Sequence, residues 1–288
     1  MRFKDFIIVK SAEEAVSISM ELGKEGFIMA GGTSTTYIAD NSEKIAIDIT
    51  RAGLSGIEKK DGGFRIGATT TIDEIARFNM DGWVLSEPAW RLATQQIRNI
   101  STIGGNISRV FWWSDFPVVL LALDAKIEIK DSCASGGKTE MNALDFFFTQ
   151  PVKILKPGKI ITSIWVPAVG GDCGFGYAKK TKTSPGFTIC TTASMITLKD
   201  EEFEEVKVAI GGVFPFPRRL IELEKVLKGK KCNRNEVEGV VKNVVSTLKC
   251  AGREGMSSEY SAHLLSVTIT DSIFMAVERA GDGKNERC

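Results

Sequence analysis

Histidine is almost absent from this chain, and its scarcity limits the chemistry that the chain can support. Only one histidine, His263, occurs among the 288 residues. A metal site or a proton relay that needs a pair of histidines is therefore excluded. A Ser-His-Asp triad is permitted by the count, but nothing in the sequence around His263 supports one. We predict no catalytic residue and no metal ligand on this chain.

Closely spaced cysteine pairs are also missing. The six cysteines are scattered, and none forms a C-x-x-C motif with another. Iron–sulfur clusters and structural zinc need thiolates that converge, usually from such pairs. A chain of this length also does not need a disulfide framework to fold. We therefore expect free thiols in a reducing cytoplasm.

Long apolar runs and a net charge of one sign are lacking as well. Lys and Arg total 37 and Asp and Glu total 36, so the long-range basic field that favours nucleic acid is absent. No apolar run approaches the roughly 20 residues of a membrane span. The first residues lack the apolar segment of a signal peptide. Hydrophobic residues make up 43%, enough for a sizeable core in two domains.

The pattern of apolar and polar residues predicts an α+β chain that begins with a small β-α-β-loop-β unit. Ser11 is followed three residues later by Glu14, which indicates a capping box at a helix start. The stretch 71–74 repeats this pattern. We expect strands at 6–9, 27–30, 45–49, 64–68, 126–130 and 160–166, and helices at 11–22, 71–74 onward, 87–96, 115–123 and 142–148.

A stretch rich in Gly and Pro, residues 167–176, is the predicted domain boundary. Beyond it we expect strands near 188–198 and 205–211, and helices near 219–228, 234–249 and 259–280. The final segment, 281–288, is polar, and we expect a mobile tail.

Two loops with paired glycines are the most informative features. The first, Gly31-Gly32 followed by hydroxyl residues at 33–35, comes directly after a predicted strand. Glycine permits positive φ and close approach of a ligand, and successive N–H groups form nests for anions. The loop is neither a G-x-G-x-x-G fingerprint nor a Walker A loop. A pyrophosphate cradle and a simple turn at the end of a strand both remain open for it.

The second loop, Thr102-Ile103-Gly104-Gly105-Asn106, repeats the pattern of a hydroxyl beside two glycines. Two such loops can clamp a diphosphate from both sides, whereas the alternative is a pair of unrelated turns. The pairing favours the binding interpretation.

These segments resemble the FAD-binding segments of the flavin (medium) subunits of molybdenum hydroxylases, the family of xanthine dehydrogenase and carbon monoxide dehydrogenase. The similarity lies in A-G-G-T at 30–33 and in Q-I-R-N-I-S-T-I-G-G-N-I at 96–107. Downstream, S-D-F-P at 114–117, L-L-A-L-D-A at 120–125 and G-G-V-F-P-F-P-R at 211–218 also resemble family segments. The resemblance covers nearly the whole chain.

The resemblance implies a two-lobed FAD-binding domain of the p-cresol methylhydroxylase and vanillyl-alcohol oxidase type, followed by a C-terminal α/β domain. We place the first at 1–167, with lobes of about 1–52 and 53–167, and the second at 172–280. It also implies a heterooligomer, in which electrons pass from [2Fe–2S] clusters on an iron–sulfur subunit through FAD to NAD⁺ or another acceptor. A molybdopterin-binding large subunit would hydroxylate the substrate.

The same resemblance assigns cofactor-binding residues. The first loop would wrap the FAD diphosphate through its backbone, and the second would hold the other side. Asp115 would lie near the flavin or its ribityl chain, Ile161 would contact the cofactor by its main chain, and Lys179 would be a cation facing the flavin, with Lys182 as the other candidate. The loop residues are Ile28, Met29, Ala30, Gly31, Gly32, Thr33, Ser34, Thr35, Thr102, Ile103, Gly104, Gly105 and Asn106.

Three departures distinguish this chain from the family pattern. Ser34-Thr35 replaces the usual Asp-Leu, and Phe111-Trp112-Trp113 occupies a region that often holds Ser-Pro. The basic stretch 179–182 matches only loosely. The tryptophans could stack on the flavin, restrict access to it, or pack in the core or against a partner. The basic stretch could equally be a solvated hairpin.

Two other functions remain open at this point. One is a self-contained flavin oxidoreductase of the same fold, which would need its own acid or base above the flavin. The other is a nucleotide-binding regulatory subunit without redox chemistry, for which the change at Ser34-Thr35 leaves room.

Overall fold

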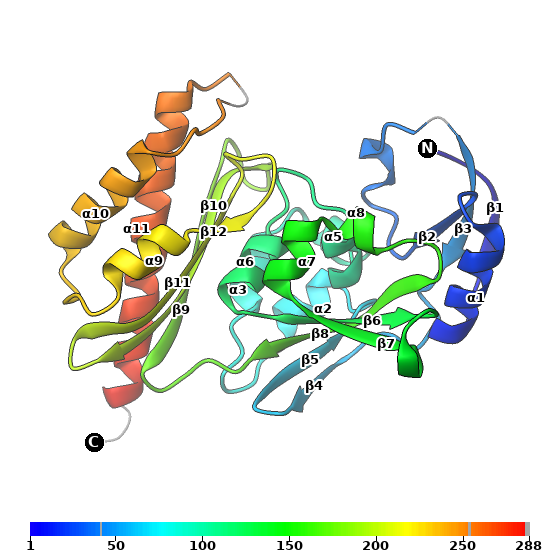
Figure 1. Ribbon diagram of the computed structural model, residues 1–288, viewed down its shortest axis with the longest axis horizontal. Coiled ribbons are helices and arrows are strands. Elements are labelled where there is room, and N and C mark those ends of the chain that lie inside the picture. The colour runs from blue at the N-terminus through cyan, green and yellow to red at the C-terminus, as the bar shows by residue number, and fades with distance from the viewer. Residues whose placement is uncertain (41, 253–254, 286–288) are drawn as a thin grey trace. The chain divides into compact units, whose positions relative to one another are not determined.

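The backbone forms two units, each with its own sheets (Figure 1). The computed structural model describes residues 1–40, 42–252 and 255–285. Unit 1 contains residues 1–78, 94–110 and 125–166, and unit 2 contains the segments 79–93 and 111–124 together with everything from 167 onward. Each unit is therefore assembled from pieces that are distant in the sequence.

The first sheet of unit 1 is parallel, with the strand order β1-β3-β2. Its strands are β1 (Arg2–Ile8), β2 (Gly26–Met29) and β3 (Glu43–Asp48). Helix α1 (Ala12–Leu22) begins at Ser11, whose side chain accepts a hydrogen bond from the backbone N–H of Glu14. The apolar face of this helix packs on the sheet and buries Ala15, Val16 and Ile47. This arrangement places the first glycine loop at the carboxyl end of β2.

The second sheet of unit 1 has five strands in the order β4-β5-β8-β6-β7. The strands are β4 (Ile57–Lys60), β5 (Gly63–Gly67), β6 (Lys126–Asp131), β7 (Lys138–Asn142) and β8 (Lys159–Pro167). Short helices accompany them: α2 (Ile72–Arg77), α4 (Gln95–Arg98), α5 (Ile103–Ser108), α7 (Ala143–Thr149) and α8 (Pro151–Ile154), with 3₁₀ turns η1 (Thr35–Tyr37) and η2 (Ser135–Gly137). The interior is apolar, because Phe64, Ile66, Ile127 and Phe146 are fully buried.

The start of α2 offers a local test of the predicted capping box. Thr71 and Glu74 form a complete capping box, in which each side chain accepts the other residue's backbone N–H. We expect Thr71→Ala to lower the free energy of unfolding by about 1 kcal/mol, because the backbone N–H of Glu74 loses its acceptor. Urea denaturation measures the change, and Thr71→Ser, which keeps the hydroxyl, is the matched control. A Thr71→Ala variant as stable as the wild type would contradict this account.

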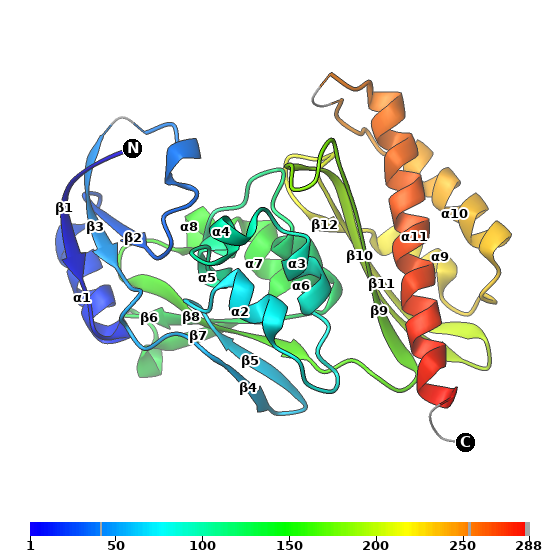
Figure 2. The same ribbon diagram turned by 180° about the vertical axis from the view of Figure 1, so that it is seen from behind.

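Unit 2 is built on an antiparallel sheet with the order β12-β11-β10-β9. The strands are β9 (Cys173–Thr181), β10 (Thr188–Lys199), β11 (Glu202–Gly211) and β12 (Arg218–Arg219). Helices α9 (Ile221–Leu227), α10 (Arg234–Ser246) and α11 (Ser258–Asn285) contribute to one apolar core with the sheet. Figure 2 shows α11 running along the sheet. Helices α3 (Ser86–Trp90) and α6 (Phe116–Ala122) also belong to this unit.

Alternation along β9 separates its two faces. A Cβ atom at Gly176 would lie 1.9 Å from the carbonyl oxygen of Ser272 in α11, so the helix lies directly on the backbone of the strand. The same holds for Gly174 and the carbonyl of Ala276. Side chains alternate across a strand, and Tyr177 and Lys179 therefore point to the opposite face. Glycine on one face and large side chains on the other thus let α11 approach one face of β9 closely.

Most of the predicted elements are present with shifted ends, and the secondary structure differs from the prediction at four places. The predicted helix 87–96 is two short helices, α3 and α4, because Ala93 between them has φ of +45°. The second glycine loop contains a helix, α5. Strand β9 was not expected, and it covers residues 173–181, which include the end of the Gly- and Pro-rich stretch and most of the basic stretch. Helix α11 continues into the expected tail, whose residues 286–288 lie outside the described part.

Candidate cofactor site

The first glycine loop presents a row of unpaired backbone donors. The N–H groups of Gly31, Gly32, Thr33 and Ser34 make no hydrogen bond to any residue that the structure describes. Gly32 has φ of +66°, a left-handed conformation that glycine adopts at little cost. The loop residues 28–35 are all half-buried. Successive free N–H groups at a left-handed turn form an anion-binding nest.

The structure brings the two glycine segments together within unit 1. A Cβ atom at Gly31 would lie 1.7 Å from the carbonyl oxygen of Ile100, which shows how closely the backbones approach. The hydroxyl of Ser101 also donates a hydrogen bond of 3.1 Å to the Thr33 hydroxyl, over 68 positions of sequence. The motif therefore needs Gly31 for packing against the second segment as well as for ligand access.

The backbone N–H groups at the start of α5 already donate hydrogen bonds within the protein. The N–H groups of Ile103 and Gly104 donate to the carbonyls of Thr70 and Ala68, at 3.0 and 2.8 Å. The N–H of Gly105 donates to the Thr102 hydroxyl. These N–H groups at the start of α5 are therefore not available to a ligand. The second segment instead supports the first loop by packing against it.

Two further observations show what the second segment can offer. A Cβ atom at Gly104 would lie 2.7 Å from the carbonyl oxygen of Ala68, so glycine is required there for close packing. The side-chain oxygen Oδ1 of Asn106 is buried and has no hydrogen-bond partner among the described residues. A buried polar atom without a partner costs free energy, and a bound ligand would relieve that cost.

The residues of unit 1 therefore fit an FAD diphosphate. The unpaired N–H groups of the first loop suit a double anion, and the glycines leave room for it. The Ser34-Thr35 replacement does not remove this feature, because the donors belong to the backbone. Ile161 lies on β8, and the residue as a whole is 5% exposed.

Unit 2 contains the two remaining predicted residues, and they form a buried ion pair. Lys179 Nζ lies 2.6 Å from Asp115 Oδ2, and the side chains are 6% and 4% exposed. Asp115 precedes α6, and its other oxygen, Oδ1, accepts a hydrogen bond of 2.6 Å from the Thr188 hydroxyl. Lys179 also donates to the carbonyl oxygen of Arg91 at 3.1 Å. This arrangement neutralises the charge of Lys179 locally and leaves one of its three donors without a described acceptor.

Sequence reasoning missed Thr188 and Arg91, which complete this network. Neither belongs to a motif, and Arg91 and Lys179 are 88 positions apart. Beside the network, the fully buried Tyr177 hydroxyl has no hydrogen-bond partner among the described residues. Burial, followed by the nearby charge of Asp115, raises the pKa of Tyr177 well above its usual value. The phenol therefore stays neutral at physiological pH.

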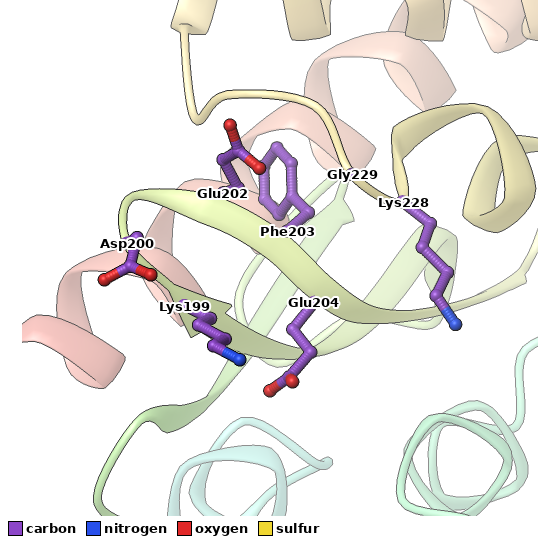
Figure 3. A pocket seen from close by; sticks show the side chains of 7 residues that line it. All are labelled: Lys199, Asp200, Glu202, Phe203, Glu204, Lys228 and Gly229. Carbon is purple, nitrogen blue, oxygen red and sulfur yellow. The ribbon is translucent and has the colours of Figure 1, made fainter.

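A pocket of about 330 Å³ at the β10–β11 hairpin is unrelated to these residues (Figure 3). Figure 3 shows charged side chains that do not converge on a common centre. Carboxylates outnumber ammonium groups there, which disfavours a diphosphate. The lining residues are Lys199, Asp200, Glu202, Phe203, Glu204, Lys228 and Gly229.

The described residues offer neither a metal site nor a membrane span. They contain no cluster of three or more His, Cys, Asp or Glu side chains placed to hold a metal ion. None of the described helices is both long and apolar enough to cross a membrane. The five cysteines whose state the structure gives, Cys133, Cys173, Cys190, Cys232 and Cys250, are free thiols, and Cys288 lies outside the described residues.

Comparison with known proteins identifies the family. Residues 1–169 match the FAD binding domain in molybdopterin dehydrogenase, and residues 177–273 match the CO dehydrogenase flavoprotein C-terminal domain. The chain is 33% identical over 239 residues to the glyceraldehyde dehydrogenase medium chain of Sulfolobus acidocaldarius, covering 81% of this chain and 80% of the relative. It is 25% identical to the 6-hydroxypseudooxynicotine dehydrogenase complex subunit alpha of Paenarthrobacter nicotinovorans, over 96% of this chain and 95% of that one.

A solved structure shows the same fold. The structure of carbon monoxide dehydrogenase from Hydrogenophaga pseudoflava contains a chain with a TM-score of 0.88 and 23% identity, covering 97% of this chain and 98% of that chain. The mixed α and β architecture is thus confirmed. The chain belongs to the molybdenum hydroxylase family as an FAD-binding medium subunit of its oxidoreductases, as its sequence motifs predicted.

Proposed function

We propose that this chain carries electrons from the [2Fe–2S] clusters of an iron–sulfur subunit through FAD to NAD⁺ or another acceptor. A molybdopterin-binding large subunit hydroxylates the substrate in the same complex. The observation that carries the proposal is the row of four unpaired N–H groups at 31–34, held against residues 100–101. FAD exchanges electrons singly or in pairs, so it can link one-electron clusters to a two-electron acceptor.

The proposal includes the fold and the residues that would hold the cofactor. FAD would bind to a two-lobed domain of the p-cresol methylhydroxylase type at 1–167, with the C-terminal domain at 172–280. Backbone donors of the first loop would bind the diphosphate, and the side chain of Asn106 would add a polar contact. Asp115 and the remaining donor of Lys179 would serve the flavin or its ribityl chain. The free thiols suit a cytoplasmic location.

An absorption spectrum of the natively purified protein, with metal and subunit analysis of the same sample, tests the proposal. We expect bands of oxidised flavin, and iron and molybdenum in chains that elute together with this one. Bleaching of the flavin bands by substrate and their return on addition of NAD⁺ would identify the acceptor. A chain that cannot be reconstituted with FAD would overturn the proposal, as would hydroxylation of a heterocycle by the purified chain alone.

A further inference from the structure

The hydroxyl groups of the first glycine loop are engaged in different ways. Thr35 donates its hydroxyl proton to the carbonyl oxygen of Gly32 at 2.8 Å, so this proton is used within the loop. The Thr33 hydroxyl instead accepts the hydrogen bond from Ser101. A hydroxyl has one proton to donate and two lone pairs that accept. The contact with Ser101 therefore occupies a lone pair of Thr33, and its proton has no acceptor among the described residues.

Ser101 is held firmly enough to impose this direction. Its backbone N–H donates to the carbonyl oxygen of Ile97, and its carbonyl oxygen accepts from the N–H of Ile72, both at 2.8 Å. The residue is 7% exposed, so its hydroxyl proton needs an acceptor within the protein. The Thr33 hydroxyl is the one acceptor that the described residues give it. Donation from Ser101 thus leaves Thr33 free to act as a donor.

The proton of the Thr33 hydroxyl belongs to the residue that also supplies one of the free N–H groups at 31–34. An anion held by these N–H groups is an acceptor that this hydroxyl lacks. A hydrogen bond to a charged phosphate oxygen is stronger than one between neutral groups. A hydroxyl that already accepts a hydrogen bond also donates more strongly, because the two bonds polarise each other in the same direction.

We propose that Ser101 is a positioning residue for the FAD diphosphate, because its hydroxyl makes the Thr33 hydroxyl a donor to that group. This inference rests on the proposed binding of the diphosphate by the first loop, and it adds a side-chain donor to the backbone donors. Ser101 acts through Thr33 and does not itself touch the cofactor. Its contribution to binding should therefore disappear when residue 33 has no hydroxyl.

Titration of the full-length chain, freed of flavin, with FAD tests this inference, and the flavin fluorescence gives the Kd. We expect Ser101→Ala and Thr33→Val each to raise the Kd about three- to tenfold, which corresponds to the loss of one hydrogen bond. The double variant should bind FAD as Thr33→Val alone does, because Ser101 has no effect without the Thr33 hydroxyl. Thr33→Ser keeps the hydroxyl and should bind FAD like the wild type.

Ser19→Ala is the matched control for the loss of a buried hydroxyl. Ser19 also belongs to unit 1 and is 4% exposed, and its hydroxyl accepts a hydrogen bond of 2.9 Å from the N–H of Gly158, 139 positions away. It lies in α1, outside both glycine segments, so its Kd for FAD should equal that of the wild type. Phosphorus NMR of bound FAD gives a second measurement. The diphosphate resonances should move in Ser101→Ala and stay in place in Ser19→Ala.

The outcomes separate this inference from the proposed function. A wild-type chain that takes up no FAD would overturn both. If the wild type binds FAD, an unchanged Kd in Ser101→Ala, or additive losses in the double variant, would overturn the positioning role alone. A raised Kd with unmoved phosphorus resonances would also overturn it, because the loss would then come from the fold rather than from the diphosphate contact.

Discussion

Gly31→Ala should abolish FAD binding. The new Cβ atom would lie 1.7 Å from the carbonyl oxygen and 2.6 Å from the carbonyl carbon of Ile100. Both are backbone atoms, so no side-chain rotation can relieve the overlap, and the two segments must separate. Separation breaks the hydrogen bond from Ser101 to Thr33 and distorts the row of free N–H groups. We expect the bound flavin absorbance per chain to fall at least tenfold.

Gly53→Ala is the matched control for that loss. Gly53 also lies in unit 1 and has φ of +70°, but nothing lies within 4 Å of its added Cβ atom. Its cost is the conformational strain of a left-handed alanine, about 1 kcal/mol, and its FAD content should match that of the wild type. Gly32→Ala, with φ of +66° and only ordinary contact to Met29, should fall between the two. Full flavin occupancy in Gly31→Ala would show that the two segments need not touch for binding.

The elements that could be predicted from the sequence are those whose pattern is local. Ser11 and Thr71 cap their helices as predicted, because a hydroxyl acceptor and the donor it serves are three residues apart. The strands β4 and β7 were missed. Both are short, polar strands at the two edges of the five-stranded sheet, where no apolar alternation marks them.

The helix and the strand that were not predicted both contain glycines that serve contacts distant in sequence. Gly104 and Gly105 lower helix propensity and predict a loop, but the structure has α5 there, and Gly104 is needed because Ala68 packs against it. No strand is predicted over Gly174 and Gly176, yet both lie within β9 and allow α11 to approach the strand. A single sequence shows that a glycine is present without showing which backbone it faces.

In the candidate site, too, local features could be predicted from the sequence, whereas contacts with distant residues could not. The free donors of the first loop follow from the local order of strand, Gly-Gly and hydroxyl residues. The sequence could not show that N–H groups of the second loop already donate hydrogen bonds, because their acceptors belong to residues 68–70. The resemblance pointed to Asp115 and Lys179 individually, and the structure adds that each is the other's counterion.

Lys179→Met should destabilise unit 2 by about 3–5 kcal/mol, because it leaves the Asp115 carboxylate buried without its counterion. Methionine preserves the apolar length of the side chain, so the effect comes from the lost charge rather than from a cavity. The Thr188 hydroxyl alone cannot compensate an ionised carboxylate that is 4% exposed. Urea denaturation of the full chain, followed by circular dichroism, measures the change.

Two further variants separate the buried charge from the site itself. Adding Asp115→Asn to Lys179→Met removes the unpaired charge, and we expect most of the lost free energy of unfolding to return, because replacing both members of a buried pair is often nearly neutral. Lys180→Met is the matched control: the Lys180 side chain is 44% exposed and its Nζ lies 3.8 Å from Asp271 Oδ2, so the change should stay below about 1 kcal/mol. If Lys179→Met were as stable as Lys180→Met, the ion pair would not hold α6 to the sheet. If the double variant regained stability but not FAD, the pair would serve the cofactor as well as the fold.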